Sequence, residues 1–149
     1  MINCRVWFGA LVVVAATSPV FAQQPQAAAG RIKVASGSAF IVRAGALLPA
    51  QAGAMVFEAD GLKTGADGRL GITLKDDTRV SLGPGSEVRL DRFLFVPAEG
   101  RLGLVLNVVR GVMAYVSGRI AKLAPDSIRL ETPAAVVGVR GTTIALRVE

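Results

Sequence analysis

Apolar and polar residues alternate with a period of two along much of this chain. Between Leu70 and Leu74 the apolar side chains stand at even positions, and the same parity returns beyond Asp76-Asp77. Because successive side chains of a β-strand point to opposite faces, this pattern predicts short strands that each bury one face. The apolar positions that share this parity are Leu70, Ile72, Leu74, Val80, Leu82, Val88 and Leu90.

Residues typical of turns separate these predicted strands. Asp can bond its own downstream backbone and Gly accepts a positive φ, so both suit tight connections. Their close spacing is typical of a sandwich, a barrel or a solenoid. The turn signals are Asp60-Gly61, Asp67-Gly68, Asp76-Asp77 and Gly83-Pro84-Gly85.

The alternation continues in the second half of the chain, with one helical signal. Gly118–Ala124 is predicted to form a single helical turn before Pro125, and Ile128–Glu131 is a further alternating strand. No long amphipathic helix is expected after the first 22 residues. The even positions expected to face inward are Leu102, Leu104, Leu106 and Val108, followed beyond Arg110-Gly111 by Val112, Ala114 and Val116.

The parity of the apolar positions changes near Gly141. Val137 and Val139 are apolar at odd positions, whereas Ile144 and Leu146 are apolar at even ones. A slip of one residue turns every later side chain to the opposite face unless a β-bulge absorbs it, and Gly makes such a bulge inexpensive. We therefore predict a bulge or tight kink at Gly141.

Together these patterns predict an all-β fold, either an antiparallel two-layer β-sandwich or a short β-solenoid. The chain has 149 residues, of which 52% are hydrophobic, and this is enough for one domain with its own core. We expect this domain to occupy residues 31–149. The stretch 23–30 (QQPQAAAG) has little to pack and is expected to be a linker.

The first 22 residues are typical of a secretory signal peptide. Arg5 supplies the positive charge, Val6–Ala16 the apolar run, and Val20-Phe21-Ala22 a cleavage site with small residues at its first and last positions. The apolar run is shorter than the roughly 20 residues that span a bilayer. We expect cleavage after Ala22 and a mature protein that is periplasmic or secreted and not integral to a membrane. Cys4 leaves with the signal.

The residue types present exclude several chemistries. The chain has no His, and its single Cys lies in the predicted signal. Disulfides, thiol nucleophiles, imidazole bases and the usual zinc or haem ligands are therefore excluded, and we assign no catalytic residue, metal or cofactor. Removal of Arg5 from 17 Lys and Arg leaves 16 against 11 Asp and Glu. This positive balance favours acidic glycans, anionic lipid head groups or nucleic acid.

Carboxylates are the remaining basis for catalysis. A hydrolase would need two of them across a cleft, with pKa values pushed apart. All candidates but Glu87 lie in predicted turns, where a bond to the local backbone accounts for them. Their spacing matches no calcium-binding loop. A carboxylate-dependent hydrolase is kept as a minor alternative, and its candidates are Asp60, Asp67, Asp76, Asp77 and Glu87.

Basic residues alternate with the inward apolar positions. We expect them to line the outer face of one sheet, where they either bind an anionic partner or form a solvated face that discourages edge pairing. Nucleic acid is not an expected partner, because the protein leaves the cytoplasm and offers few aromatic side chains for stacking. The candidate partner-binding residues are Arg69, Lys75, Arg79 and Arg89, and Arg92 continues the series.

Several short motifs follow one another in a recognisable order. Residues 63–70 (KTGADGRL), 76–78 (DDT) and 82–86 (LGPGS) precede the segment 132–142 (TPAAVVGVRGT). In this order they resemble the FecR domain family, whose second half carries a T-P-x-A-x-x-x-V-R-G-T signature. The resemblance covers roughly residues 31–149, and its most specific residues are Thr132, Pro133, Val139, Arg140, Gly141 and Thr142.

The resemblance implies an all-β periplasmic module. In the best-known members this module relays the ligand occupancy of a TonB-dependent outer-membrane transporter to a sigma factor. We therefore expect a non-enzymatic binding or signalling module with an envelope protein as partner, and we expect Arg140 to bond carbonyl groups at the predicted bulge. The alternatives are an envelope structural module that binds glycan or lipid through its basic face, and the hydrolase.

Overall fold

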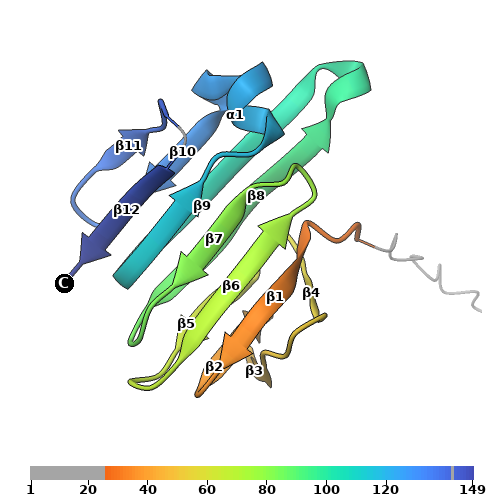
Figure 1. Cartoon of the computed structure of the whole chain (residues 1–149). Coiled ribbons are helices and arrows are strands. Elements are labelled where there is room, and N and C mark those ends of the chain that lie inside the picture. Colours follow the sequence, from red (N-terminus) through yellow and green to blue (C-terminus); the bar gives the residue numbers. More distant parts are fainter. Residues whose placement is uncertain (1–25, 142) are drawn as a thin grey trace, which may run out of the picture.

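The computed structural model describes residues 26–141 and 143–149 (Figure 1). The predicted signal peptide (residues 1–22), the first part of the predicted linker and Thr142 lie outside the described residues. Within the described residues the chain forms twelve strands and short helical turns. All of their strand pairs except one are antiparallel, so the prediction of an all-β, antiparallel fold is confirmed.

Most strands are short, as the alternating segments predicted, but two are long and pair with each other. No helix in this part of the chain has the length and apolar character needed to cross a membrane. The strands are β1 (Gly30–Ser36), β2 (Ala39–Arg43), β3 (Ala46–Pro49), β4 (Met55–Val56), β5 (Gly61–Thr64), β6 (Arg69–Leu74), β7 (Arg79–Leu82), β8 (Glu87–Val96), β9 (Arg101–Val116), β10 (Ile128–Glu131), β11 (Val136–Gly138) and β12 (Thr143–Val148); the helices are α1 (Arg119–Leu123) and the 3-10 turns η1 (Pro97–Glu99) and η2 (Pro125–Ser127).

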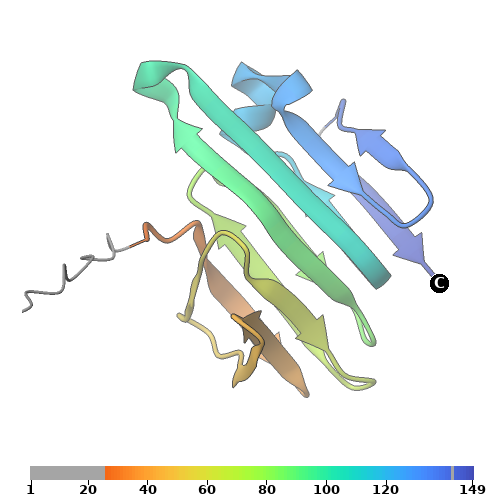
Figure 2. The ribbon, with the colours of Figure 1, turned by 180° about the vertical axis from the view of Figure 1, so that it is seen from behind.

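The strands form one continuous sheet that curls like a half-barrel into two facing halves. Along the main path the order is β3-β2-β5-β8-β9-β7-β6-β1-β4. The half that lies in front in Figure 1, the front half, contains β1, β4, β6, β7 and β12. The half that Figure 2 shows from behind, the back half, contains β2, β3, β5, β8, β10 and β11. Strand β9 belongs to both halves.

The core lies between the two halves. The inward positions predicted in β6, β7 and β8 join one apolar cluster, and none of them is more than 3% exposed. Side chains from β1, β2, β4, β5, β9, β10 and α1 complete this cluster together with Ala29 and Val139. The period-two pattern of residues 70–90 therefore identified the buried face of these strands correctly.

Strand β9 reverses its parity at Gly111, and here the predicted inward positions were wrong. Met113 and Tyr115 are fully buried, whereas Val112 is 36% exposed. The strand leaves the back half, where it pairs with β8 and β10, and enters the front half, where it pairs with β7 and β12. Gly111 has a φ of 90°, which other residues rarely adopt. Because Val112–Val116 contains only apolar residues, the sequence pattern does not show the reversal.

The parity change at Gly141 also marks a passage between the halves, not a bulge within one strand. β11 ends at Gly138 and pairs with β10, and β12 begins at Thr143 and pairs with β9. Gly141 lies in the connection, with a φ of 139°. The chain therefore turns sharply at this position, but the turn joins two strands in different halves.

The helix α1 forms where the helical turn Gly118–Ala124 was predicted, and it docks on the turn between β6 and β7. The carboxylate of Asp76 accepts a hydrogen bond from the Ile120 amide at 3.3 Å. The approach is close because Gly118 has no side chain: a Cβ there would lie 2.3 Å from the Asp76 carbonyl oxygen. Asp76, which lies 44 positions earlier in the chain than Ile120, thus bonds a backbone amide in the first turn of this helix.

Candidate functional site

The outer face of the front half carries a group of exposed cations. The register places Arg31 of β1 beside Thr73 of β6, and Thr73 beside Arg79 of β7, so these side chains share one face. Arg69 begins β6, and Lys75 follows its last residue. We call this group the basic face and define it by its exposed residues Arg31, Lys33, Arg69, Lys75 and Arg79.

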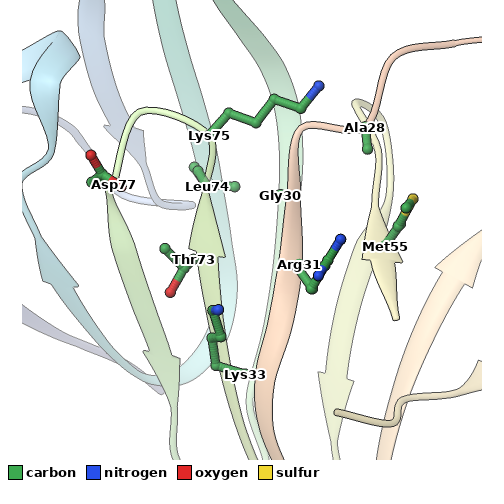
Figure 3. Close-up of a pocket in the computed structure, with 9 residues that line it drawn as sticks. All are labelled: Ala28, Gly30, Arg31, Lys33, Met55, Thr73, Leu74, Lys75 and Asp77. Carbon is green, nitrogen blue, oxygen red and sulfur yellow. The ribbon is translucent and has the colours of Figure 1, made fainter. Parts of the chain in front are cut away.

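A shallow hollow of about 340 Å³ lies at one end of the basic face. Arg31, Lys33 and Lys75 line it together with Thr73 and Met55 (Figure 3). In the view of Figure 3, Lys75 extends from the end of β6 across the start of β1, and Arg31 lies on β1 between Thr73 and Met55. Three cations therefore surround one small concave surface, an arrangement suited to an anionic group.

A β-bulge brings Lys33 to this hollow. The pairing of β1 with β6 shifts between Ile32 and Val34, so that Lys33 is an extra residue in β1. Ile32 is fully buried, whereas both Lys33 and Val34 are exposed. The bulge thus adds a cation to the outer face without disturbing the buried side.

The cations of the basic face differ from several other arginines in their ion pairing. Among the described residues none of the five forms an ion pair, whereas five arginines elsewhere do. Asp77 also lines the hollow, but Arg119 holds its carboxylate at 3.3 Å. The basic face therefore carries positive charge that no neighbouring carboxylate balances. The paired arginines are Arg43 with Asp60, Arg89 with Asp91, Arg101 with Glu99, Arg110 with Glu87, and Arg119 with Asp77.

Arg89 and Arg92 do not belong to the basic face, which corrects the prediction of a single stripe. Both lie on β8 in the back half, and the curl of the sheet turns the outer face of β8 away from that of β6 and β7. Arg89 is bonded to Asp91, and this hydrogen bond and charge raise the pKa of Arg89. Of the predicted partner-binding residues, the structure brings together Arg69, Lys75 and Arg79.

The carboxylates considered for hydrolysis each have a separate environment. Asp60 is 2% exposed and accepts two hydrogen bonds from Arg43, at 2.7 and 2.9 Å. Hydrogen bonds from Ser38 lower the pKa of Asp67, which is exposed. Asp76 is fully buried, and its oxygens accept bonds from the amides of Thr78 and Ile120.

The remaining two acidic candidates add no converging pair. Asp77 is exposed beside Arg119, and Glu87 lies on the outer side of β8 near Arg110. In residues 26–141 and 143–149 there is no group of three or more His, Cys, Asp or Glu that could hold a metal ion. The bond of Asp76 to the Thr78 amide, two residues later, matches the turn role predicted for it, whereas Asp67 accepts from the amide of Ser38, 29 positions earlier.

The described residues of the T-P…V-R-G-T motif, Thr132 to Gly141, surround β11, where the chain passes from the back half to the front half. The Thr132 hydroxyl closes the turn between β10 and β11, where it accepts a hydrogen bond from the Ala135 amide at 3.0 Å. Pro133 is exposed in that turn. Val139 is 2% exposed and joins the core. Arg140 is exposed, and within the described part of the chain its side chain has no hydrogen bond or ion pair, so the predicted bonds to carbonyl groups are not found there.

Sequence reasoning missed Arg31, Lys33 and Met55 as members of the site. The signal that could have found Arg31 and Lys33 is their alternation with the apolar residues Ile32 and Val34. The pattern by itself does not show that β1 pairs with β6, a strand almost forty residues later. Only this pairing places the two cations beside Lys75.

The comparison with protein families gives one result. The model of the FecR family, described as FecR protein, matches residues 60–149. Comparisons with curated proteins and with solved structures returned no match. The matched segment contains β5–β12 and the whole T-P…V-R-G-T motif, while β1–β4 precede it. Because the match covers more than half of the chain and includes its most specific motif, the chain belongs to the FecR family.

Proposed function

We propose that this protein is a periplasmic signalling module of the FecR type that acts by binding a protein partner of the cell envelope. Its membership of the FecR family supports a signalling role. The signal-like residues 1–22 support export. Binding in place of catalysis is supported by the lack of His in the sequence and by the separate bonding of the candidate carboxylates.

The open edge of β12 beside Arg140 is the observation that carries this proposal. Among the described residues β12 pairs with β9 alone, so the backbone groups along its other edge are available to an added strand. Arg140 lines an adjoining hollow of about 380 Å³ together with Arg129 and Ile144. An extended partner segment would pair its backbone with β12 and offer an acidic side chain to Arg140.

Site-specific cross-linking tests this surface. A photoreactive residue in place of Ala145, which is exposed on β12, is compared with one in place of Ala98, which is exposed between β8 and β9. In living cells we expect a cross-linked envelope protein at position 145 and none at 98. Arg140→Ala should lower the yield of the cross-linked product at position 145 several-fold. Equal products at both positions, or a yield unaffected by Arg140→Ala, would overturn the proposed surface.

Export is tested separately from partner binding. The protein is recovered from the periplasmic fraction and its N-terminus is sequenced. We expect it to begin at Gln23, because the leader ends in Val20-Phe21-Ala22. An intact leader on protein found in the cytosol would contradict the periplasmic location.

A further inference from the structure

The basic face has an extent that suits a surface better than a single small ligand. It spans β1, β6 and β7, and its cations lie both at the start of β6 (Arg69) and just beyond its end (Lys75). With strands roughly 4.8 Å apart and about 3.3 Å per residue, the face measures on the order of 10 by 20 Å. The hollow at one end has room for one compact anion. The cations outside the hollow are placed to contact further anionic groups.

Exposed apolar side chains lie among these cations. Val34 is 58% exposed and Met55 is 50% exposed. Val34 pairs with Gly71, and Met55 pairs with Arg31, so both side chains stand on the same outer face. A mixture of Lys or Arg with exposed apolar groups is typical of surfaces that bind the interface of a membrane, where head groups meet the charges and the apolar tips enter below them.

The distribution of charge over the molecule favours one orientation toward an anionic surface. In the back half Arg89 is paired with Asp91 and Arg110 with Glu87, whereas Arg92 and Arg129 form no ion pair among the described residues. In the front half, the five cations of the basic face have no acidic partners among the described residues. An anionic plane therefore attracts the front half more strongly than the back half, which favours one orientation of approach.

We propose that the basic face docks on the phosphodiester head groups of an anionic lipid bilayer, with the hollow between Arg31, Lys33 and Lys75 holding one phosphate. This surface lies apart from the β12 edge to which the partner protein is assigned, so the two proposals stand independently. Docking through the front half would hold the protein at a membrane surface while β12 stays accessible at the side of the sheet.

Vesicle sedimentation tests the proposal with purified protein lacking residues 1–22. The probes are vesicles of phosphatidylcholine alone and of phosphatidylcholine with phosphatidylglycerol, at low and at high NaCl. We expect binding to the anionic vesicles only, with loss at high salt because the screening length falls from roughly 10 Å at 0.1 M to 3 Å at 1 M. Equal binding to both kinds of vesicle would overturn the proposal.

A pair of triple variants with the same change of net charge locates the binding face. Arg31→Gln, Lys33→Gln and Arg79→Gln together remove charge from the basic face and should weaken vesicle binding about a hundredfold, or about fivefold for each cation. The control changes Arg89, Arg101 and Arg110 to Gln on the back half and should have less than about a threefold effect. Circular dichroism checks that both variants are folded. An equal loss in the two variants would overturn the assigned face.

Two further probes distinguish a bilayer from other anions. Val34→Ser with Met55→Ser should weaken binding to vesicles several-fold and leave binding to polyglutamate unchanged, because only a bilayer accepts apolar side chains. Inorganic phosphate at matched ionic strength should not release the protein from vesicles. Release by phosphate would assign the hollow to the free ion, and polyglutamate binding as tight as vesicle binding would assign the face to an acidic protein. Either result would overturn docking on lipid.

Discussion

The hydroxyl group of Ser86 bonds both backbone groups of Val112: it accepts from the Val112 amide at 2.9 Å and donates to the Val112 carbonyl at 3.0 Å. Ser86 is fully buried, and its own amide is bonded to the hydroxyl of Thr64 at 2.9 Å. These bonds form where β9 passes from the back half to the front half. The Ser86 side chain, together with the Gly83 amide, therefore continues the pairing of β9 between β8 and β7.

Ser86→Ala should destabilise the fold by about 1–3 kcal/mol, because the Val112 amide would lose its partner beside a buried side chain, while the Val112 carbonyl would keep only the bond from the Gly83 amide. Urea unfolding followed by circular dichroism measures this. Ser81→Ala is the control, since Ser81 is exposed on the outer side of β7, and it should change the free energy of unfolding by less than about 0.5 kcal/mol. Equal stability of the two variants would show that the Ser86 bonds contribute little.

Gly111→Ala should lower the stability of the fold more than Gly85→Ala does. Both residues have a positive φ, 90° at Gly111 and 63° at Gly85. A Cβ at Gly111 would lie 2.4 Å from the Ser86 Cα, whereas a Cβ at Gly85 has nothing within 4 Å. We expect about 1 kcal/mol of strain at Gly85 and at least about 3 kcal/mol at Gly111, measured by thermal unfolding. A smaller loss at Gly111 than at Gly85 would contradict the close contact at the bend.

Asp76→Ala should loosen α1 and lower stability by about 2–4 kcal/mol. The buried carboxylate accepts bonds from the Thr78 hydroxyl and the Ile120 amide, and the variant leaves both donors unpaired. Asp77→Asn, next to it but 75% exposed, should have an effect below about 0.5 kcal/mol, because Asn tolerates the positive φ of 68° at this position. Hydrogen exchange should show faster exchange of the Ile120 amide in the Asp76 variant only. Unchanged exchange of the Ile120 amide would contradict the role of Asp76 at the start of α1.

Tyr115 should make stability depend on pH at the alkaline end. Burial raises the pKa of its phenol above the ordinary value of 10.0. The folded state therefore holds the proton more tightly than the unfolded state. This contribution to stability is fully present below about pH 10 and is lost as the pH rises through the folded-state pKa.

Tyr115→Phe provides the measurement. The hydroxyl is buried and has no hydrogen-bond partner in the described part of the chain, so at neutral pH the variant should be as stable as the natural protein or up to about 1 kcal/mol more stable. Its stability should also fall less above pH 10. Because the chain has one Tyr, ultraviolet titration of the phenolate reports this residue alone. A normal titration in the folded protein would contradict the role of burial.

The sequence by itself determined the class of fold and much of the core. Strict alternation identified the inward positions of β6, β7 and β8, since one face of each strand is apolar and the other is polar. The short helix before Pro125 and the turns at Asp and Gly were equally visible. The motif ending in Val139-Arg140-Gly141 indicated the FecR family, which the family comparison confirms.

Tertiary structure alone decided where strands distant in sequence meet. It placed β9 in both halves, so the inward parity reversed at Gly111 within a segment whose residues are all apolar and carry no periodic signal. It also separated Arg89 from Arg79 and joined Arg31 to Lys75. The physical reason is that periodicity records which side of a strand is buried, whereas the pairing and curl of strands depend on contacts between residues far apart in the chain.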